Sequence, residues 1–304
     1  EFVVHLESYG KRSNELTLFV REDQVYEKKK IPVIFHVVHN GGDIGTHQNV
    51  AYHIIQDEIQ RANEALDNTF VNFTSRSLNA VNTYFEIIPV EKDPQGNTLS
   101  EIGVNRIMAN NDFTTQNETG EFMFNNMWNP HEYLNIFVME INPSSRWADF
   151  SWAYLPILSQ PLPGVRYSEV EPVLTFGFGI MLNNNHFDTR NQVFAHELGH
   201  ILSLLHTWAP EGSECFNSDY VNDTQDYINI PSNLSSNRRK DCEGKYFVST
   251  NFMDYNHGNY NSFTFDQRER MQFTYENAYF FPRNSSLIGG RKISTRKWKG
   301  EFDA

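Results

Sequence analysis

Hydrophobic residues occur in several short clusters that polar segments separate. Four of these clusters are rich in β-branched and aromatic residues, and they predict strands over 31–38, 83–90, 133–141 and 173–182. Between the first two clusters, apolar residues recur every three or four positions, from Ile55 through Ile59 and Ala62 to Leu66. This spacing is typical of an amphipathic helix. Strands interleaved with a helix indicate an α/β or α+β fold.

The second half of the chain has a different pattern. Residues 208–251 are polar, rich in Asn, Asp and Ser, and weakly periodic. A stretch of this length without regular structure is usually functional or pinned to the rest of a domain. Thr264 and Gln267 then match a capping box, which predicts a last helix over 265–278.

These patterns suggest three parts along the chain. A chain of 304 residues is close to the upper limit for a single hydrophobic core. We expect a lead-in or pro-segment remnant over 1–30, one large domain over 31–282, and a basic tail over 283–304. Residue 1 is Glu and no leader is recognisable, so either a leader and pro-segment were removed or the sequence starts internally.

Net charge and hydropathy argue against two classes of protein, nucleic-acid binders and proteins that span a membrane. The chain has 25 Lys and Arg against 38 Asp and Glu, a formal net charge of −13. Nucleic-acid binding needs a basic face, so we expect no nucleic-acid partner. No apolar run approaches the roughly 18 residues of a membrane span. We therefore expect a protein without a membrane span, and a monomer.

The two cysteines, Cys215 and Cys242, lie 27 positions apart. A pair at this spacing forms a disulfide or two unrelated thiols, and the disulfide is the interpretation we favour. It would restrain the long polar segment and would imply an oxidising, extracytoplasmic location.

The chemistry is concentrated in the segment from His196 to His206. Thr189 and Gln192 match a capping box, so we expect a helix that starts near residue 190. On such a helix His196 and His200 share one face and can reach one metal ion. Two imidazoles suit Zn²⁺, which in a catalytic site needs a third protein ligand and one open position.

Glu197 and His206 complete this motif. Glu197 follows the first histidine and is placed to take a proton from a metal-activated water. His206 can return to the metal only if the helix ends before it, and such endings usually need a residue that tolerates positive φ. The competing interpretation is a helix with exposed histidines. It is disfavoured because the surrounding helix is apolar and would bury polar groups without purpose.

The motif HELGHILSLLH resembles the extended zinc signature of the metzincin metallopeptidases. Residues 251–255, NFMDY, resemble the Met-turn of that clan. The finer resemblance is to the pappalysin family and extends over about 31–280. It is carried by His206-Thr207-Trp208, by Val221-Asn222-Asp223-Thr224, and by Phe263-Thr264 with Gln267, Arg270 and Met271.

The resemblance implies a secreted zinc endopeptidase that acts on proteins or peptides. His196, His200 and His206 would bind zinc, and Glu197 would be the general base. Met253 would lie under the histidines, and Tyr255 would hydrogen-bond the oxyanion of the tetrahedral intermediate. The family also implies structural calcium, for which the hard oxygen ligands available are those of Asp219, Asp223 and Asp226.

The implied fold has two subdomains. An upper subdomain over about 31–202 would contain a twisted, mostly parallel sheet and the zinc-binding helix. A lower subdomain over about 203–282 would be irregular, rich in loops and closed by a C-terminal helix. A substrate would lie extended along an edge strand of the upper sheet, for which 149–155 is the candidate.

The chain departs from the family pattern in three ways. Ser203 stands where the signature has Gly, which would strain the backbone if the position is left-handed. Gly258 stands where relatives that cleave before Arg or Lys have Asp, so a preference for basic residues does not carry over. A second disulfide cannot form. No cysteine precedes residue 196 either, which excludes cysteine-to-zinc latency within this chain.

Three alternatives remain open from the sequence. In a thermolysin-like peptidase the third ligand would be a downstream Glu such as Glu211 or Glu214. A catalytically silent homologue would use the cleft to bind a protein partner. A structural zinc module is disfavoured because a closed metal site does not require Glu197.

Overall fold

The structure, a computed structural model, describes residues 26–70, 79–109, 112–186, 192–229, 238–255 and 261–283, together with the backbone of four short N-terminal strands. Those strands are β1 (Phe2–Val4), β2 (Glu7–Ser8), β3 (Lys11–Arg12) and β4 (Leu16–Leu18). Strand β1 pairs with β4 and β2 pairs with β3, both antiparallel.

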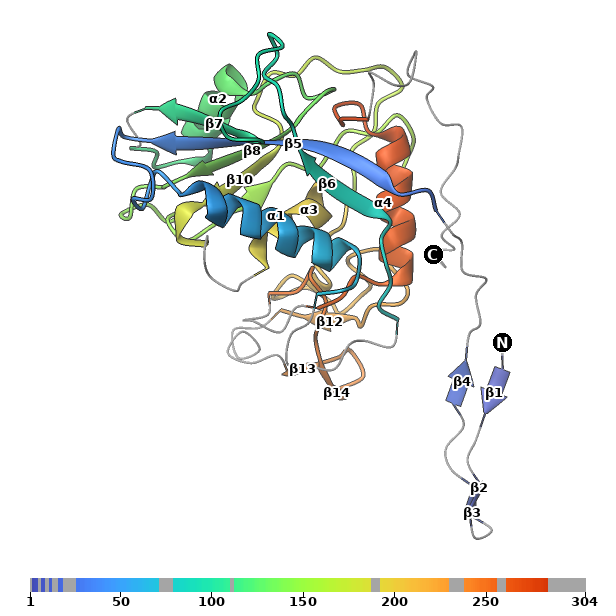
Figure 1. Ribbon diagram of the computed structural model, residues 1–304. Helices are drawn as coiled ribbons and strands as arrows, with labels where there is room; N and C mark the ends of the chain where they lie inside the picture. Colours follow the sequence, from blue (N-terminus) through green and yellow to red (C-terminus); the bar gives the residue numbers. More distant parts are fainter. Residues whose placement is uncertain are drawn as a thin grey trace.

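A six-stranded sheet forms the centre of the molecule (Figure 1). Its strands are β5 (Lys29–His39), β6 (Phe85–Pro89), β7 (Val104–Met108), β8 (Leu134–Met139), β9 (Trp152–Ala153) and β10 (Ile180–Asn183). The order is β6-β5-β8-β10-β9, and β7 continues beside β5 beyond β6. All pairs are parallel except β9 with β10. The mostly parallel α/β sheet that we expected is thus confirmed.

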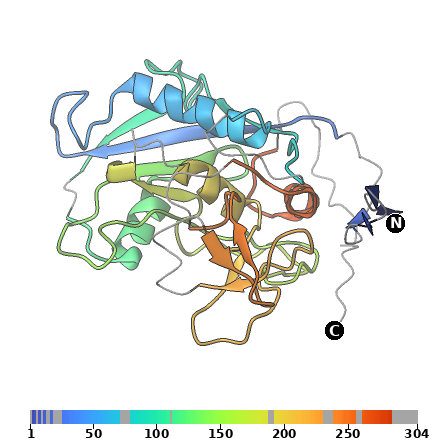
Figure 2. The same cartoon turned by 90° about the horizontal axis from the view of Figure 1, so that it is seen from below.

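Strand β5 is central because its side chains pack into the hydrophobic clusters on both faces of the sheet. Val33, Phe35 and Val37 pack into one core with α1 (Tyr52–Leu66) and α3 (Val193–Ile201). Val38 points to the other face and packs with Met123 of α2 (Gln116–Asn126). Figures 1 and 2 show the sheet between α1 and α2. Burial on both faces explains why the parallel strands are continuously apolar.

The chain beyond residue 202 is mostly irregular. It contains the two-stranded pairs β11 (Trp208–Ala209) with β12 (Tyr227–Ile228) and β13 (Arg238–Lys240) with β14 (Tyr246–Val248). Helix α4 (Phe265–Asn277) follows and packs into the main core. A short 3₁₀ helix, η1 (Asn184–His186), follows β10.

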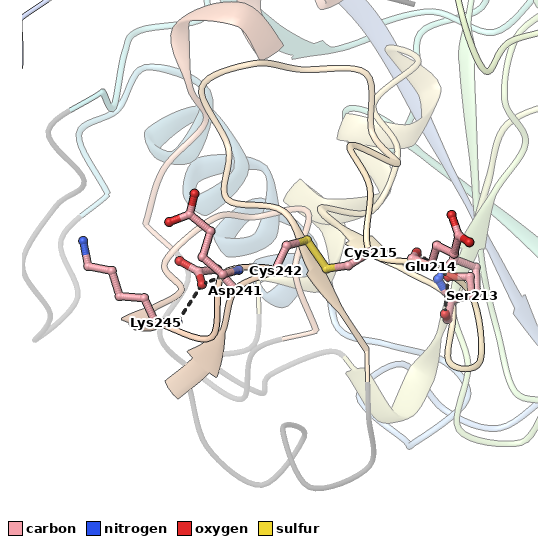
Figure 3. Close-up of a disulfide and its surroundings, with 8 residues drawn as sticks. Ser213, Glu214, Cys215, Asp241, Cys242 and Lys245 are labelled. Carbon is pink, nitrogen blue, oxygen red and sulfur yellow. Dashed lines mark hydrogen bonds between the residues drawn. A yellow bond between two sulfur atoms is a disulfide. The ribbon is translucent and has the colours of Figure 1, made fainter.

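The disulfide between Cys215 and Cys242 is present, with the two Cα atoms 5.6 Å apart (Figure 3). Cys242 lies in the turn between β13 and β14, and its backbone N–H donates to the carbonyl of Asp226. In that turn the backbone N–H of Lys245 donates to the Asp241 carboxylate. The bridge therefore ties the β13–β14 hairpin to the segment that follows β11.

The capping boxes had mixed outcomes. At α4, Thr264 accepts from the backbone N–H of Gln267, whose side chain accepts in return, as predicted. The helix expected to start near residue 190 begins only at Val193, after an N-cap, Gln192, that makes no side-chain capping bond, and the proposed cap, Thr189, is not among the described residues. Residues 187–191 lie outside the described part of the chain.

The predicted elements also needed correction elsewhere. The strand predicted over 173–182 begins only at Ile180, because Gly179, at φ +136°, lies close to the backbone of Asn135 and is not in strand conformation. Strand β7 and helix α2 were not predicted. None of the helices in the described ranges combines the length and apolar character that a membrane crossing requires.

Candidate active site

Helix α3 carries the central motif, and its end determines the geometry. The helix stops at Ile201, and Ser203 has φ +67°, in the left-handed region. The backbone N–H groups of Ser203 and Leu204 donate to the carbonyls of His200 and Gly199. This turn reverses the chain within three residues, so that His206 comes back toward the helix. The prediction that such a helix ending needs a residue with positive φ is confirmed, and the residue is Ser203.

The three histidine rings converge. Their Nε2 atoms lie 3.2 Å apart between His196 and His206, 3.1 Å between His196 and His200, and 3.1 Å between His200 and His206. In a tetrahedral zinc site with Zn–N bonds of about 2.0–2.1 Å, the nitrogens are roughly 3.3 Å apart. Among the described residues these three form a group whose ligand atoms all lie within 4.8 Å of one another. The observed separations therefore fit a single zinc ion.

Backbone carbonyls fix the orientation of two rings. His196 Nδ1 lies 2.7 Å from the carbonyl oxygen of Phe252, and His200 Nδ1 lies 2.8 Å from that of Leu204. A carbonyl oxygen only accepts, so both Nδ1 atoms carry the proton and both Nε2 lone pairs face the common centre. Such convergent lone pairs are stabilised by a cation between them.

Burial keeps the histidines neutral. It lowers the pKa of His196 to about 3, with a further contribution from the charge of His200, and lowers that of His200 to about 4. Burial, together with the other two rings, also lowers the pKa of His206. Neutral imidazole is the form that binds metal, so the site is ready for a cation at neutral pH.

Glu197 is buried next to the triad. Its carboxylate accepts from the backbone N–H of Ala153 in β9, and its Oε2 has no hydrogen-bond partner among the described residues. Burial raises the pKa of Glu197 to about 8. A cation at the histidines would favour the ionised form and lower this value. The carboxylate is thus held at one oxygen and available at the other.

Met253 lies under the helix. Its sulfur occupies the space beside Gly199, where an added Cβ would lie 2.3 Å from it. The turn is held from within, because the backbone N–H of Met253 donates to the Asn251 side chain. The glycine between the two helical histidines is therefore required for the close approach of the Met-turn.

Two aromatic side chains cover the triad. The Tyr255 ring is partly exposed and lies 4.7 Å from the His206 ring and 5.8 Å from the His196 ring. Burial, and then the charge of Glu197, raises the pKa of its phenol, so Tyr255 is protonated at neutral pH. Trp208 stacks on His206 with centroids 4.5 Å apart and an interplanar angle of 12°. We had not predicted this stacking, although an aromatic residue two positions after a metal ligand is a signal for it.

The three predicted calcium ligands do not converge. Asp219 is buried and accepts from Val221 and Thr224, while Asp223 accepts from the Thr264 hydroxyl and the backbone N–H of Asp266. Both carboxylates are thus engaged in holding the loop and the start of α4. The calcium prediction therefore has no support from the described residues.

The other possible third ligands are placed differently. Glu211 and Glu214 are both exposed, and neither belongs to the converging group. Gly258, which bears on the preference for basic residues, lies outside the described residues.

The triad, Glu197 and Tyr255 face one open cavity of about 980 Å³. Strand β9, the edge strand of the sheet, forms one rim, within the predicted stretch 149–155. The cavity wall is largely apolar away from the histidines, and its apolar residues include Phe150, Trp152, Leu155, Val193, Leu205, Trp208 and Phe216.

Comparisons with known proteins agree with this geometry. The profile of a peptidase family described as pregnancy-associated plasma protein-A matches residues 117–276, slightly more than half of the chain. No curated protein gives a match.

Solved structures of mirolysin are similar to this chain over most of its length. Mature mirolysin from Tannerella forsythia, in complex with a cleaved peptide, is 25% identical with a TM-score of 0.60, covering 82% of this chain and 92% of its own. Mirolysin in complex with a molecule described as compound 9 is 26% identical with a TM-score of 0.63, covering 83% of this chain and 93% of its own. A Tannerella forsythia promirolysin mutant is 26% identical with a TM-score of 0.63, covering 82% and 81%.

Proposed function

The chain belongs to the pappalysin family of metzincin-type zinc metalloendopeptidases, and from this membership we propose that it is a secreted enzyme that cleaves proteins with Glu197 as the general base. The observation that carries the proposal is the convergence of three imidazole Nε2 atoms beside a buried carboxylate in one open cavity. The similar mirolysin structure with a cleaved peptide supports peptide as the substrate.

His196, His200 and His206 would hold the zinc ion, which supplies Lewis acidity toward a water molecule and the scissile carbonyl when bound. The free Oε2 of Glu197 takes the proton from the attacking water and then delivers it to the leaving amine. The hydrogen bond from Ala153 keeps the carboxylate oriented for both transfers. The carboxylate therefore needs no rearrangement between the two steps.

Tyr255 and β9 complete the assignment of roles. The protonated Tyr255 hydroxyl donates a hydrogen bond to the oxyanion that develops on the substrate carbonyl. The outer edge of β9 accepts the substrate backbone as an added strand, which aligns the scissile bond with Glu197. We assign this catalytic unit to residues 31–282.

The location outside the cell rests on two observations. The Cys215–Cys242 disulfide is formed, and disulfides persist in oxidising compartments. The chain is also similar to mirolysin, whose mature form and pro-form indicate removal of a pro-segment, as is common in secreted proteases. Mass-spectrometric detection of the chain in the culture medium of its source cells, with the two cysteines oxidised, would test secretion.

Cleavage of a mixed peptide library by the zinc-loaded protein, with and without a zinc chelator, tests the activity. We expect chelator-sensitive cuts, and their flanking residues would define the preference that the apolar cavity wall imposes. Absence of cuts by protein that contains one zinc per chain would instead favour a catalytically silent homologue. The left-handed Ser203 is the feature that would then call for the Ser203→Gly variant.

Two substitutions test the assigned residues. Glu197→Gln should keep the zinc content and lower kcat by roughly two to four orders of magnitude, because the base is lost while the shape is retained. His206→Ala should weaken zinc binding. Turnover of Glu197→Gln close to wild type would contradict the general-base role, and unchanged zinc affinity in His206→Ala would contradict the third ligand.

A further inference from the structure

A buried arginine lies behind the Met-turn. Arg239 is the middle residue of β13, where its neighbours Arg238 and Lys240 are exposed while its own side chain is only 1% exposed. Alternation along the strand directs Arg239 inward. Burial of a guanidinium is costly unless all of its charge is compensated, so its partners indicate what it stabilises.

The partners of Arg239 are the two residues that follow Met253. Its Nε lies 3.2 Å from Asp254 Oδ2, and its Nη2 donates to Asp254 Oδ1 at 3.2 Å and to the backbone carbonyl of Tyr255 at 2.8 Å. The buried hydroxyl of Tyr227 also donates to Asp254 Oδ1. The carboxylate is thereby held from two sides, by β12 and by β13.

This cluster determines where the backbone of Tyr255 lies. Asp254 is held by the ion pair and by its backbone N–H, which donates to the carbonyl of Asn251. The carbonyl of Tyr255 is held directly by Arg239. The Tyr255 ring projects from this backbone toward the His196 and His206 rings. A shift of the carbonyl would therefore move the phenol relative to the reacting carbonyl.

The contacts require a guanidinium. One planar group reaches a carboxylate and a carbonyl at the same time, through two nitrogens in fixed geometry. A lysine ammonium can keep the charge pair but cannot make both contacts, because it lacks the two nitrogens of the guanidinium in fixed geometry. Lysine at position 239 would therefore leave the ion pair and release the Tyr255 carbonyl.

We propose that Arg239 is a positioning residue for the hydrolysis, and that it acts by holding the backbone of Tyr255 so that the phenol reaches the oxyanion. The proposal rests on the function assigned to Tyr255 above.

A double-mutant cycle tests it with Arg239→Lys, Tyr255→Phe and the combined variant, each at full zinc content. Tyr255→Phe should lower kcat by roughly 100-fold. Arg239→Lys should lower kcat by roughly 10- to 100-fold through misplacement, with little change in KM. In the Tyr255→Phe background, Arg239→Lys should have almost no further effect. An equal loss in both backgrounds, or Tyr255→Phe with wild-type kcat, would overturn the proposal.

A second measurement does not depend on turnover. With 3-fluorotyrosine incorporated, the ¹⁹F resonance of Tyr255, assigned from its loss in Tyr255→Phe, should shift in Arg239→Lys. Arg238→Lys is the matched control, because that exposed residue stacks on Tyr246 of the same hairpin, and it should leave both kcat and the resonance unchanged. A Tyr255 resonance that is identical in wild type and Arg239→Lys would overturn the proposal. If the wild type cleaves no peptide, the proposed function fails, and the resonance alone decides the role of Arg239.

Discussion

At the residue scale, Ser203 combines two unfavourable features. It has φ +67°, and its buried hydroxyl has no hydrogen-bond partner among the described residues. Left-handed backbone costs a residue with a side chain about 1–2 kcal/mol, and an unpaired buried hydroxyl costs about 1–3 kcal/mol. The site keeps its geometry because the surrounding turn and Arg270, which donates to the Ser203 carbonyl, hold it.

Two substitutions separate these costs. Ser203→Ala removes only the hydroxyl, whereas Ser203→Gly also relieves the backbone strain. The stability gained by Ser203→Gly is reduced by about 0.4–1 kcal/mol, because glycine gives the unfolded chain more conformational freedom. We expect both variants to be more stable than wild type, with Ser203→Gly the more stable by up to about 1 kcal/mol. Urea unfolding at fixed zinc content measures both. If Ser203→Ala is as stable as Ser203→Gly, the backbone strain is no larger than the cost of the added freedom of the unfolded chain, about 0.4–1 kcal/mol.

His36 makes stability depend on pH. Its ring is buried between two amides, with Nε2 2.9 Å from Asn135 Oδ1 and Nδ1 2.9 Å from Asn105 Nδ2. Burial lowers its pKa from 6.5 to about 4, despite the bond to Asn135. The unfolded chain therefore binds a proton at His36 that the folded chain does not, and stability falls as pH drops from 6.5 toward 4.

At pH 5, protonation of His36 in the unfolded chain should lower the free energy of unfolding by roughly 2 kcal/mol. His36→Gln should be destabilised at pH 7, but it should lose about 2 kcal/mol less than wild type on going from pH 7 to pH 5. Unfolding by urea at both pH values checks this difference, in which other titrating groups cancel. The same pH dependence in both proteins would contradict a depressed pKa at His36.

At the element scale, the two capping boxes allow a matched comparison. Thr115 caps α2 at an exposed position, and its hydroxyl accepts from Glu118 N–H. Thr264 caps α4 while buried, and its hydroxyl also donates to Asp223 at 2.6 Å. Removal of a capping hydroxyl costs about 1 kcal/mol, and loss of the hydrogen bond that Thr264 donates to the partly buried carboxylate of Asp223 adds more.

We therefore expect Thr115→Ala to lower the free energy of unfolding by about 1 kcal/mol and Thr264→Ala by about 2–4 kcal/mol. Chemical denaturation of both variants provides the measurement. Equal losses would mean that Asp223 finds another partner when Thr264 is lost.

At the scale of the whole molecule, metal binding and folding are coupled. The three histidines come from α3 and the segment after it, and two of them are oriented by carbonyls of Phe252 and Leu204. The converged site therefore requires the complete fold, so zinc binds the folded chain and stabilises it. At free zinc a thousandfold above Kd, the gain is about 4 kcal/mol.

Removal of zinc by a chelator should lower Tm by roughly 6–8 °C for a chain of this size. Glu197→Gln should show the same shift, because its ligands are intact. His206→Ala should show little shift in Tm, since this variant binds zinc only weakly before the chelator is added. Calorimetry of the three proteins with and without chelator tests this, and a full shift in His206→Ala would mean that the stabilising zinc lies elsewhere.

The local pattern determined most of the elements that carry chemistry. Helical spacing from Ile55 to Leu66, the apolar run of β5 and the capping box at Thr264 each depend on neighbours in sequence. The histidine spacing likewise required a helix that stops before His206. These features could be predicted because residues three or four positions apart in a helix are necessarily close.

Tertiary structure alone decided the contacts between distant segments. The carbonyl of Phe252 orients His196 across 56 residues, and Arg239 reaches Tyr255 across 16. The start of α3 and the late start of β10 depend on packing rather than on a local signal, which is why both predictions failed. The sequence by itself therefore determined the family, the candidate metal ligands and the main elements. The orientation of each group at the reacting centre depends on backbone atoms, which have no signature in the sequence.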